Sequence, residues 1–346
     1  MEKEMVTYYK ELEEFANAMS TFPASSFNST FEYDTGKLIK ILQKKEVFEI
    51  CNTDEEQFDS IDRTDRELGK IVSDLLKETD LDQLLKEYLD IEKKIENSFS
   101  GNLYMYAKQG ALSVKSLYYY KIKDFPKALT FTLECLVLND YLVQQGIYTL
   151  NLRCFEQNKN ISRIYFRNHQ EDSGYQLIFN LINYLLNGVN ENLFGNIFSQ
   201  KEYWMKVPII RETYAYELFT MITEDMIRFN IHSTEFLPDD WYSGLDFEVN
   251  TPDRQIIYNW IYINKQLRDS NYTDYFQGLI YYFQQPYNQF YDILKIALLL
   301  DLYKFVEKNT PAYTTTLTLG IIDFMENKLY FNQSIRSLLI KNIFKA

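Results

Sequence analysis

The chain has 346 residues, of which 46% are hydrophobic and 25% charged, so it is long enough for one large core or several smaller ones and too apolar for bulk disorder. Only 11 Gly and 7 Pro are present, which disfavours a sheet-rich fold with its many tight turns. The net charge of −13 disfavours nucleic acid as a partner, because the phosphate backbone would be repelled.

Negative charge is concentrated at the start of the chain. Residues 1–100 hold 13 Lys and Arg against 24 Asp and Glu, whereas the other 246 residues hold 23 against 25. This difference predicts an acidic N-terminal helical region at 1–100 and a larger, aromatic-rich helical body at 101–346. The acidic region is complementary to a basic partner, and it is equally compatible with a solvated surface that keeps the protein soluble.

Apolar residues recur every three or four positions from the start of the chain. Met5, Leu12, Phe15 and Met19 predict a first helix, which the polar segment 21–36 ends, and a second helix is predicted over 36–51. Thr53 and Glu56 are spaced as a capping box, and Asp80 is placed to cap the following helix. Residues 53–99 therefore predict an acidic helical hairpin, with a domain boundary at 98–101.

Beyond residue 101 the helical stripes become broader and more aromatic, as expected of helices buried on more than one side. Thr251, Pro252 and Asp253 form a helix start signal. Helices are predicted at 102–121, 124–138, 140–156, 174–187, 208–230, 252–268, 272–284, 287–308, 313–327 and 332–344. The predicted fold class is all-α, an irregular helical bundle or a stack of helical hairpins with almost no strand.

One hairpin resembles a tetratricopeptide repeat, over about residues 107–140. The resemblance is carried by small and aromatic residues at the family's spacing, namely Ser116, Tyr119, Phe125, Ala128 and Cys135. Among the positions one 34-residue period later, Ser162 fits the pattern, whereas Arg153 and His169 do not. The resemblance implies tetratricopeptide-like helix packing and peptide or protein binding on a concave surface.

Signatures of several enzyme classes are absent from the sequence. It contains no GxGxxG, GxxxxGK[ST], HExxH or GxSxG motif, and its two histidines are 63 residues apart, which excludes a His-rich metal site within one chain. We therefore expect no cofactor and no metal. Three widely spaced cysteines, a charged start without an apolar signal core and no apolar stretch long enough to span a bilayer predict free thiols, a cytoplasmic location and no membrane partner.

Two polar segments contain candidate partner-binding residues. Segment 152–172 concentrates Arg153, Arg163, Arg167 and His169, and in a helix Arg163 and Arg167 would share a face able to grip a carboxylate or phosphate. These arginines could instead pair with the acidic N-terminal region and join the subdomains. Segment 239–248 contains Trp241 and Tyr242, which are typical binding anchors or, alternatively, an aromatic plug over the core.

The sequence as a whole favours a non-catalytic helical adaptor, regulator or accessory subunit that binds a protein or peptide. Two alternatives remain at this point. The first is an acidic inhibitor or immunity-type protein that blocks a basic enzyme by charge complementarity. The second is a helical enzyme whose active-site residues are dispersed in the sequence. No sequence feature predicts an oligomeric state.

Overall fold

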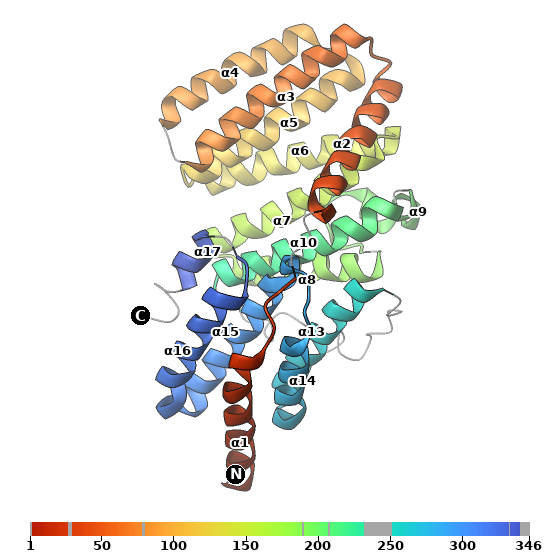
Figure 1. Ribbon diagram of the computed structural model, residues 1–346. Coiled ribbons are helices and arrows are strands. Elements are labelled where there is room, and N and C mark those ends of the chain that lie inside the picture. The colour runs from red at the N-terminus through yellow and green to blue at the C-terminus, as the bar shows by residue number, and fades with distance from the viewer. Residues whose placement is uncertain are drawn as a thin grey trace. The chain divides into compact units, whose positions relative to one another are not determined.

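The computed structural model describes residues 2–26, 30–77, 80–188, 190–206, 208–231, 251–331 and 333–339. The predicted all-α fold is confirmed: these residues form fifteen α-helices, and their only extended pairing is a single bridge between Ser26 and Asn288 (Figure 1). None of the described helices is sufficiently long and apolar to cross a membrane.

The chain divides into two compact units. Unit 1 comprises Met1–Thr30 and Tyr216–Ala346, and unit 2 comprises Phe31–Ala215. This division differs from the predicted regions 1–100 and 101–346. The first 30 residues belong with the C-terminal half, and the predicted boundary at 98–101 lies inside unit 2, where the helices on either side of it pack together.

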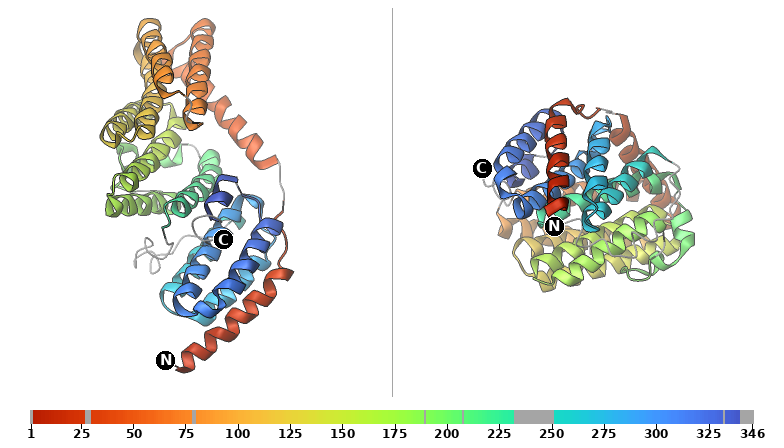
Figure 2. Two further views of the ribbon diagram at one scale, coloured as in Figure 1. Left: turned by 90° about the vertical axis from the view of Figure 1, so that its left-hand side faces the viewer. Right: turned by 90° about the horizontal axis from the view of Figure 1, so that it is seen from below.

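Unit 2 is built largely from consecutive helices that fold back on one another, and Figure 2 shows them from two further directions. The helices α3 and α4, α5 and α6, and α7 and α8 pack as pairs, while α4 packs on α5 and α6 on α7. The elements are α2 (Thr30–Cys51), α3 (Glu55–Leu76), α4 (Leu81–Ser98), α5 (Gly101–Lys121), α6 (Phe125–Gln145), η2 (Tyr148–Leu150), α7 (Asn151–Arg167), α8 (Glu171–Asn187), η3 (Asn196–Ser199), α9 (Lys201–Met205) and α10 (Pro208–Arg228), which crosses into unit 1.

The start signals of these helices were predicted with one error. Asp80 caps α4 as expected, accepting a hydrogen bond from the Gln83 backbone N–H at 3.1 Å. The capping box of α3 lies one residue later than predicted, because the reciprocal pair is Asp54 and Gln57. Thr53, predicted to be the cap, is buried instead. An aspartate carboxylate is as good a cap as a threonine hydroxyl, so the sequence offered two adjacent candidates.

The hairpin of α5 and α6 is closed by small residues. Ala128 and Cys135 are fully buried between the helices, and the Ser116 hydroxyl donates a hydrogen bond to the Ala128 carbonyl at 2.9 Å. The Cys135 thiol likewise donates to the Gln109 carbonyl of α5 at 3.1 Å. Small side chains let two helix backbones approach this closely. The hairpin is therefore observed, and its tetratricopeptide identity stays a prediction.

Helix α6 does not end at Asn139, so the predicted division between helices at 124–138 and 140–156 is wrong. The helix continues to Gln145 and ends at Gly146, which adopts φ 113°. Asp140 is buried within the helix and accepts hydrogen bonds from the Ile197 backbone N–H at 3.0 Å and from Asn196 at 3.2 Å. A polar residue that resembled a helix end in the sequence is thus satisfied by a distant segment.

Unit 1 joins the N-terminal helix to the C-terminal helices. Its elements are α1 (Glu2–Ala18), η1 (Met19–Thr21), the second part of α10, α13 (Pro252–Arg268), α14 (Tyr272–Gln284), η4 (Gln289–Tyr291), α15 (Asp292–Asn309), α16 (Pro311–Lys328) and α17 (Gln333–Leu338). The rings of Phe15 and Phe22 pack against Phe283 in edge-to-face and tilted arrangements, and Phe22 and Phe283 contact Phe324, with ring centroids 5.6–5.9 Å apart. These rings give α1 its partners more than 250 residues away.

A buried carboxylate fastens the extended segment after α1. Asp292, at the start of α15, accepts hydrogen bonds from the Ser25 hydroxyl and from the Tyr330 backbone N–H, the latter at 2.7 Å. Burial raises the pKa of Asp292 to about 6, an effect that these hydrogen bonds and nearby Lys295 partly offset. Residues 1–26 therefore belong to unit 1 through specific polar contacts as well as ring packing.

Candidate functional site

The candidate site is a groove of about 510 Å³ in unit 2, here called the unit 2 groove. One face each of α2, α3, α5 and α7 lines it; these helices are labelled in Figure 1. The lining residues are Lys40, Gln43, Lys44, Val47, Phe58, Ile61, Asp62, Asp65, Arg66, Leu68, Gly69, Val72, Tyr106, Gln109, Gly110, Ser113, Val114, Arg153 and Gln157. Three of the four helices are the first members of successive packed pairs.

Helix α2 is held in place as one wall of the groove by a few specific contacts. Val47 is buried, and the Glu46 carboxylate accepts hydrogen bonds from the Thr149 hydroxyl at 2.6 Å and backbone N–H at 2.9 Å. Burial raises the pKa of Glu46, and the Thr149 hydrogen bonds counteract that effect. On the same helix, Lys40, Gln43 and Lys44 line the groove.

Two glycines open the groove in the middle of helices. A Cβ at Gly69 of α3 would meet no atom within 4 Å, and one at Gly110 of α5 would make ordinary contacts with Leu68 at 3.6 Å and with the Asp65 carboxylate at 4.0 Å. Glycine destabilises a helix interior by roughly 1 kcal/mol relative to alanine. Since neighbouring atoms exclude a side chain at neither position, close packing within the protein does not account for these glycines. Open helix backbone facing a groove is suited to the close approach of a ligand.

Amides and a hydroxyl form a polar strip across α5 and α7. Gln109 and Gln157 are buried, and the Gln157 amide donates to the Ser113 hydroxyl at 3.4 Å. The Gln157 carbonyl also accepts from the Asn160 amide at 3.4 Å. Such side chains offer both donors and acceptors, which is the chemistry that a peptide backbone requires. Apolar surface from Phe58 and other α3 residues lies beside this strip.

A carboxylate with altered acidity lies within the groove. Asp65 is exposed as a residue, but the groove atoms around its carboxyl group desolvate it and raise its pKa to about 6; Asp62 adds to the rise, while Arg153 and a hydrogen bond from Tyr106 lower it. The Tyr106 pKa is also raised, chiefly by burial and then by Asp65. Residues from α3, α5 and α7, which are separated by up to 88 positions, thus share one electrostatic environment.

Positive side chains outnumber carboxylates along the groove. Its lining includes Lys40, Lys44, Arg66 and Arg153 against Asp62 and Asp65. Arg66 is paired with Asp62 at 2.9 Å and Arg153 with Glu156 at 2.7 Å. The Lys44 ammonium lies 4.5 Å from the centre of the Phe58 ring, a favourable cation–π distance. In a chain of net charge −13, this groove carries the opposite sign.

Of the predicted site residues in segment 152–172, only Arg153 lines the groove. Arg163 and Arg167 do lie four apart on one helix, α7, but 10 and 14 residues beyond Arg153, or roughly 15 and 21 Å along the axis. Arg163 contacts the Asn160 side chain at 3.4 Å, and Arg167 donates to the Tyr120 hydroxyl at 3.3 Å. His169 is exposed just after α7.

The other predicted residues, Trp241 and Tyr242, lie outside the described residues. The prediction that they anchor a partner therefore stays a prediction. A cluster of three aromatic residues at 281–283 is better defined. Tyr282 and Phe283 are fully buried while Tyr281 is 54% exposed, so the cluster belongs to the core with one ring turned outward.

Sequence reasoning missed most of the groove, including Gly69, Gly110 and Asp65. The glycines could have been noticed because an isolated Gly inside a strong helical pattern lowers helix stability, which indicates a packing or functional role. Asp65 had no such signal, because it is one of many acidic residues on α3. Only folding brings Tyr106 and Arg153 near it.

The three cysteines are free thiols in the structure. Burial raises the pKa of Cys51 to about 11 and of Cys135 to about 12, and that of Cys154 well above its usual value. A thiol held in its protonated form is a poor nucleophile and a poor metal ligand. Within the described parts of the chain, no group of three or more His, Cys, Asp or Glu side chains is arranged to hold a metal ion.

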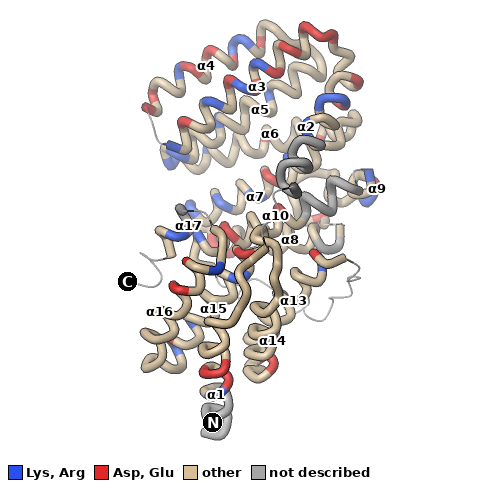
Figure 3. Tube along the Cα trace, viewed as in Figure 1, with Lys and Arg blue, Asp and Glu red and all other residues tan. Residues whose placement is uncertain are grey.

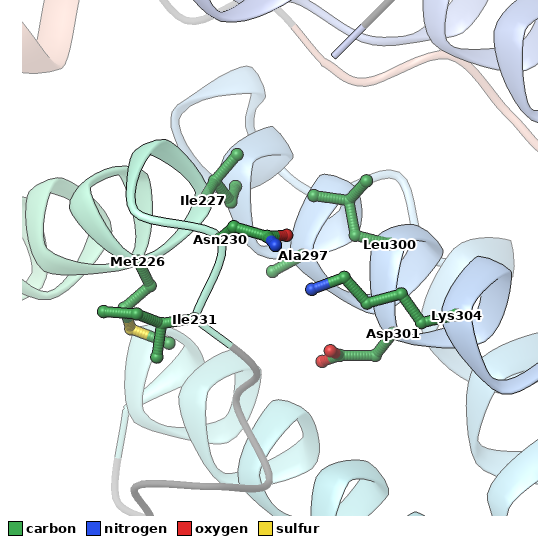
Figure 4. Close-up of a pocket in the computed structure, with 8 residues that line it drawn as sticks. All are labelled: Met226, Ile227, Asn230, Ile231, Ala297, Leu300, Asp301 and Lys304. Atoms are coloured by element: carbon green, nitrogen blue, oxygen red, sulfur yellow. The ribbon is translucent and has the colours of Figure 1, made fainter. Parts of the chain in front are cut away.

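A second, much smaller pocket lies in unit 1, between the end of α10 and α15 (Figure 4). Its volume is about 10 Å³, enough for about one water molecule. Figure 4 shows Asp301 and Lys304 reaching from α15 toward this space, opposite Met226 and Asn230. The pocket is too small for an organic ligand, so the unit 2 groove is the candidate site.

Comparisons of the chain with models of known families, with curated proteins and with solved structures find no match. We therefore infer function from the geometry and chemistry of the unit 2 groove.

Proposed function

We propose that the protein is a non-catalytic binding protein, an adaptor, regulator or accessory subunit, whose unit 2 groove holds a short peptide segment of a protein partner. One observation carries the proposal: a groove of about 510 Å³ opens on α3, α5 and α7, with helix backbone bared at Gly69 and Gly110. This volume lies within the usual range of ligand sites, roughly 300–1,000 Å³.

The chemistry of the lining supports a peptide ligand. The polar strip of Gln109, Ser113 and Gln157 supplies donors and acceptors for a peptide backbone, and the apolar surface near Phe58 suits its side chains. The tetratricopeptide resemblance of α5 and α6 leads to the same class of function by a separate route, because it implies peptide binding on a concave helical surface. We further propose a cytoplasmic location, where the buried thiols of Cys135 and Cys154 and the half-buried thiol of Cys51 would stay reduced; recovery in a membrane or extracellular fraction would argue against it.

Filling the groove tests the proposal. Peptides would be selected from a phage-displayed library of random dodecapeptides on the immobilised full chain. Their affinities would then be measured by fluorescence anisotropy for the natural chain and for Gly69→Leu. The leucine enters open space, so the fold should persist, but it occupies the ligand's place. We expect Gly69→Leu to weaken binding at least tenfold.

The matched control is Ser73→Leu, an exposed position on the same helix outside the groove. It adds the same side chain, and we expect it to leave affinity unchanged. Circular dichroism melts of both variants establish that each is folded. The proposal would be contradicted if the selected peptides bound the natural chain, Gly69→Leu and Ser73→Leu equally, or if the library yielded no binder.

A helical enzyme is the second candidate, because one observation favours it: a carboxyl group with a pKa near 6 lies in a groove beside an arginine. Its discriminating result is turnover of a small molecule that Asp65→Asn abolishes without loss of fold. The acidic inhibitor class is less favoured. Basic residues occur among the acidic ones along α3 and α4 (Figure 3), and Glu67 is paired with Lys94 at 2.9 Å, so this surface is partly neutralised.

A further inference from the structure

We propose that the peptide accepted by the unit 2 groove is acidic, with two carboxylates at alternate positions bound by Lys40 and Lys44 of α2. This inference rests on the proposed peptide-binding function and names the chemical class of the ligand. Both lysines line the groove and are exposed. Neither forms an ion pair with any described residue, whereas the adjacent Lys45, outside the groove, lies 3.8 Å from Glu49.

The carboxylates near these lysines are already engaged. Glu46 is held by Thr149 on the other side of α2, and Asp62 is paired with Arg66. Asp65 accepts a hydrogen bond from Tyr106 and lies in the field of Arg153. The positive charge of Lys40 and Lys44 is thus left for a ligand, and charge complementarity selects an anionic one.

The spacing of the two lysines suggests the pattern of the ligand. They are four residues apart on a helix, which places them on one face and roughly 6 Å apart along its axis. In an extended peptide, side chains two positions apart lie on the same side and are separated by roughly 7 Å. An extended segment lying along α2 therefore matches both lysines with the sequence acid–any residue–acid.

The Phe58 ring adds a constraint on Lys44. Its ammonium group is 4.5 Å from the ring centre, so the ring restrains the side chain near the groove. A restrained ammonium loses less conformational freedom when it binds a carboxylate than one on a fully mobile side chain. Lys44 should therefore contribute more to binding than Lys40.

Two pools of fluorescein-labelled, acetylated heptapeptides test the inference. One pool has the pattern X-X-Glu-X-Glu-X-X with X randomised, and the other has Gln at both fixed positions. Anisotropy titrations would use the full chain, Lys40→Gln/Lys44→Gln and the control Lys45→Gln. We expect the Glu pool to bind the natural chain and the control about tenfold more tightly than the Gln pool, and the double variant to lose this preference.

Other outcomes distinguish the acidic-ligand inference from the proposed peptide-binding function. Equal binding of both pools that Gly69→Leu abolishes would overturn the acidic ligand and leave peptide binding intact. Absence of binding by either pool, together with a library selection that yields no binder, would overturn both. A single-stranded 12-nucleotide DNA that binds the same lysines as tightly as the Glu pool would also overturn the inference, because the groove would then recognise any polyanion.

Discussion

At the residue scale, the groove depends on side chains whose properties come from their surroundings. Asp65 is an ordinary helical aspartate in the sequence, yet it shares its environment with Tyr106 and Arg153 from two other helices. Gly69 and Gly110 matter for the side chains they lack, since open space lies above Gly69 and only ordinary contacts would form at Gly110. Arg153 was predicted as a site residue from a local concentration of arginines, and it alone of that set reaches the groove.

The raised pKa of Asp65 predicts how stability changes with pH. Its folded pKa of about 6 lies above the ordinary aspartate value of 3.8, so the folded protein binds this proton more tightly than the unfolded chain. The resulting contribution to stability is complete below about pH 4 and is lost as pH rises through 6. The melting temperature of the natural chain minus that of Asp65→Asn should therefore fall from pH 4 to 7 and then level off.

Calorimetric melts of both proteins at pH 4, 5, 6, 7 and 8 measure this difference directly. Asn retains an oxygen that accepts the Tyr106 hydrogen bond, so the variant isolates the charge. If this difference increases with pH, then Arg153 and Tyr106 lower the pKa of Asp65 by more than burial raises it. That result would contradict the raised pKa of Asp65.

At the element scale, the sequence predicted most helices of the body closely and failed at the division between α6 and α7. The 3.6-residue period located most of the described helices, and the caps Asp80 and Thr251 were identified because capping is local chemistry. The end of α6 was missed because Asp140 is satisfied by the Ile197 backbone, 57 residues later. Local sequence carries no trace of such a distant partner.

The tight hairpin of α5 and α6 gives an element-scale prediction. Ala128 is fully buried, and its carbonyl accepts the Ser116 hydroxyl across the interface at 2.9 Å. Replacing Ala128 with Leu should force the helices apart and lower the free energy of unfolding by about 1–3 kcal/mol. Val137 lies on the same helix and is 64% exposed, so Val137→Leu should change the free energy of unfolding by less than about 0.5 kcal/mol.

Urea unfolding followed by circular dichroism gives both values. An Ala128→Leu protein as stable as the natural chain would mean that the interface has room for a larger side chain. The small residues of the tetratricopeptide-like pattern would then have no packing role in this hairpin.

At the scale of the whole molecule, the sequence predicted the fold class but not the grouping of the helices. Charge placed a boundary near residue 101, yet Phe15 and Phe22 pack with Phe283 and Phe324, so the N-terminal helix belongs to unit 1. Helical periodicity shows that a face is apolar without showing what covers it. The groove was unpredictable for the same reason, since its walls come from four helices between residues 40 and 157.

Photo-crosslinking tests most directly whether a peptide lies in the unit 2 groove. A peptide selected on the full chain would carry a benzophenone amino acid, and mass spectrometry would map its adducts after irradiation. We expect adducts on the groove faces of α2, α3, α5 and α7, within residues 40–47, 58–72, 106–114 and 153–157, and their loss in Gly69→Leu. Adducts confined to α4, α6 or unit 1, with the same yield in Gly69→Leu, would contradict peptide binding in this groove.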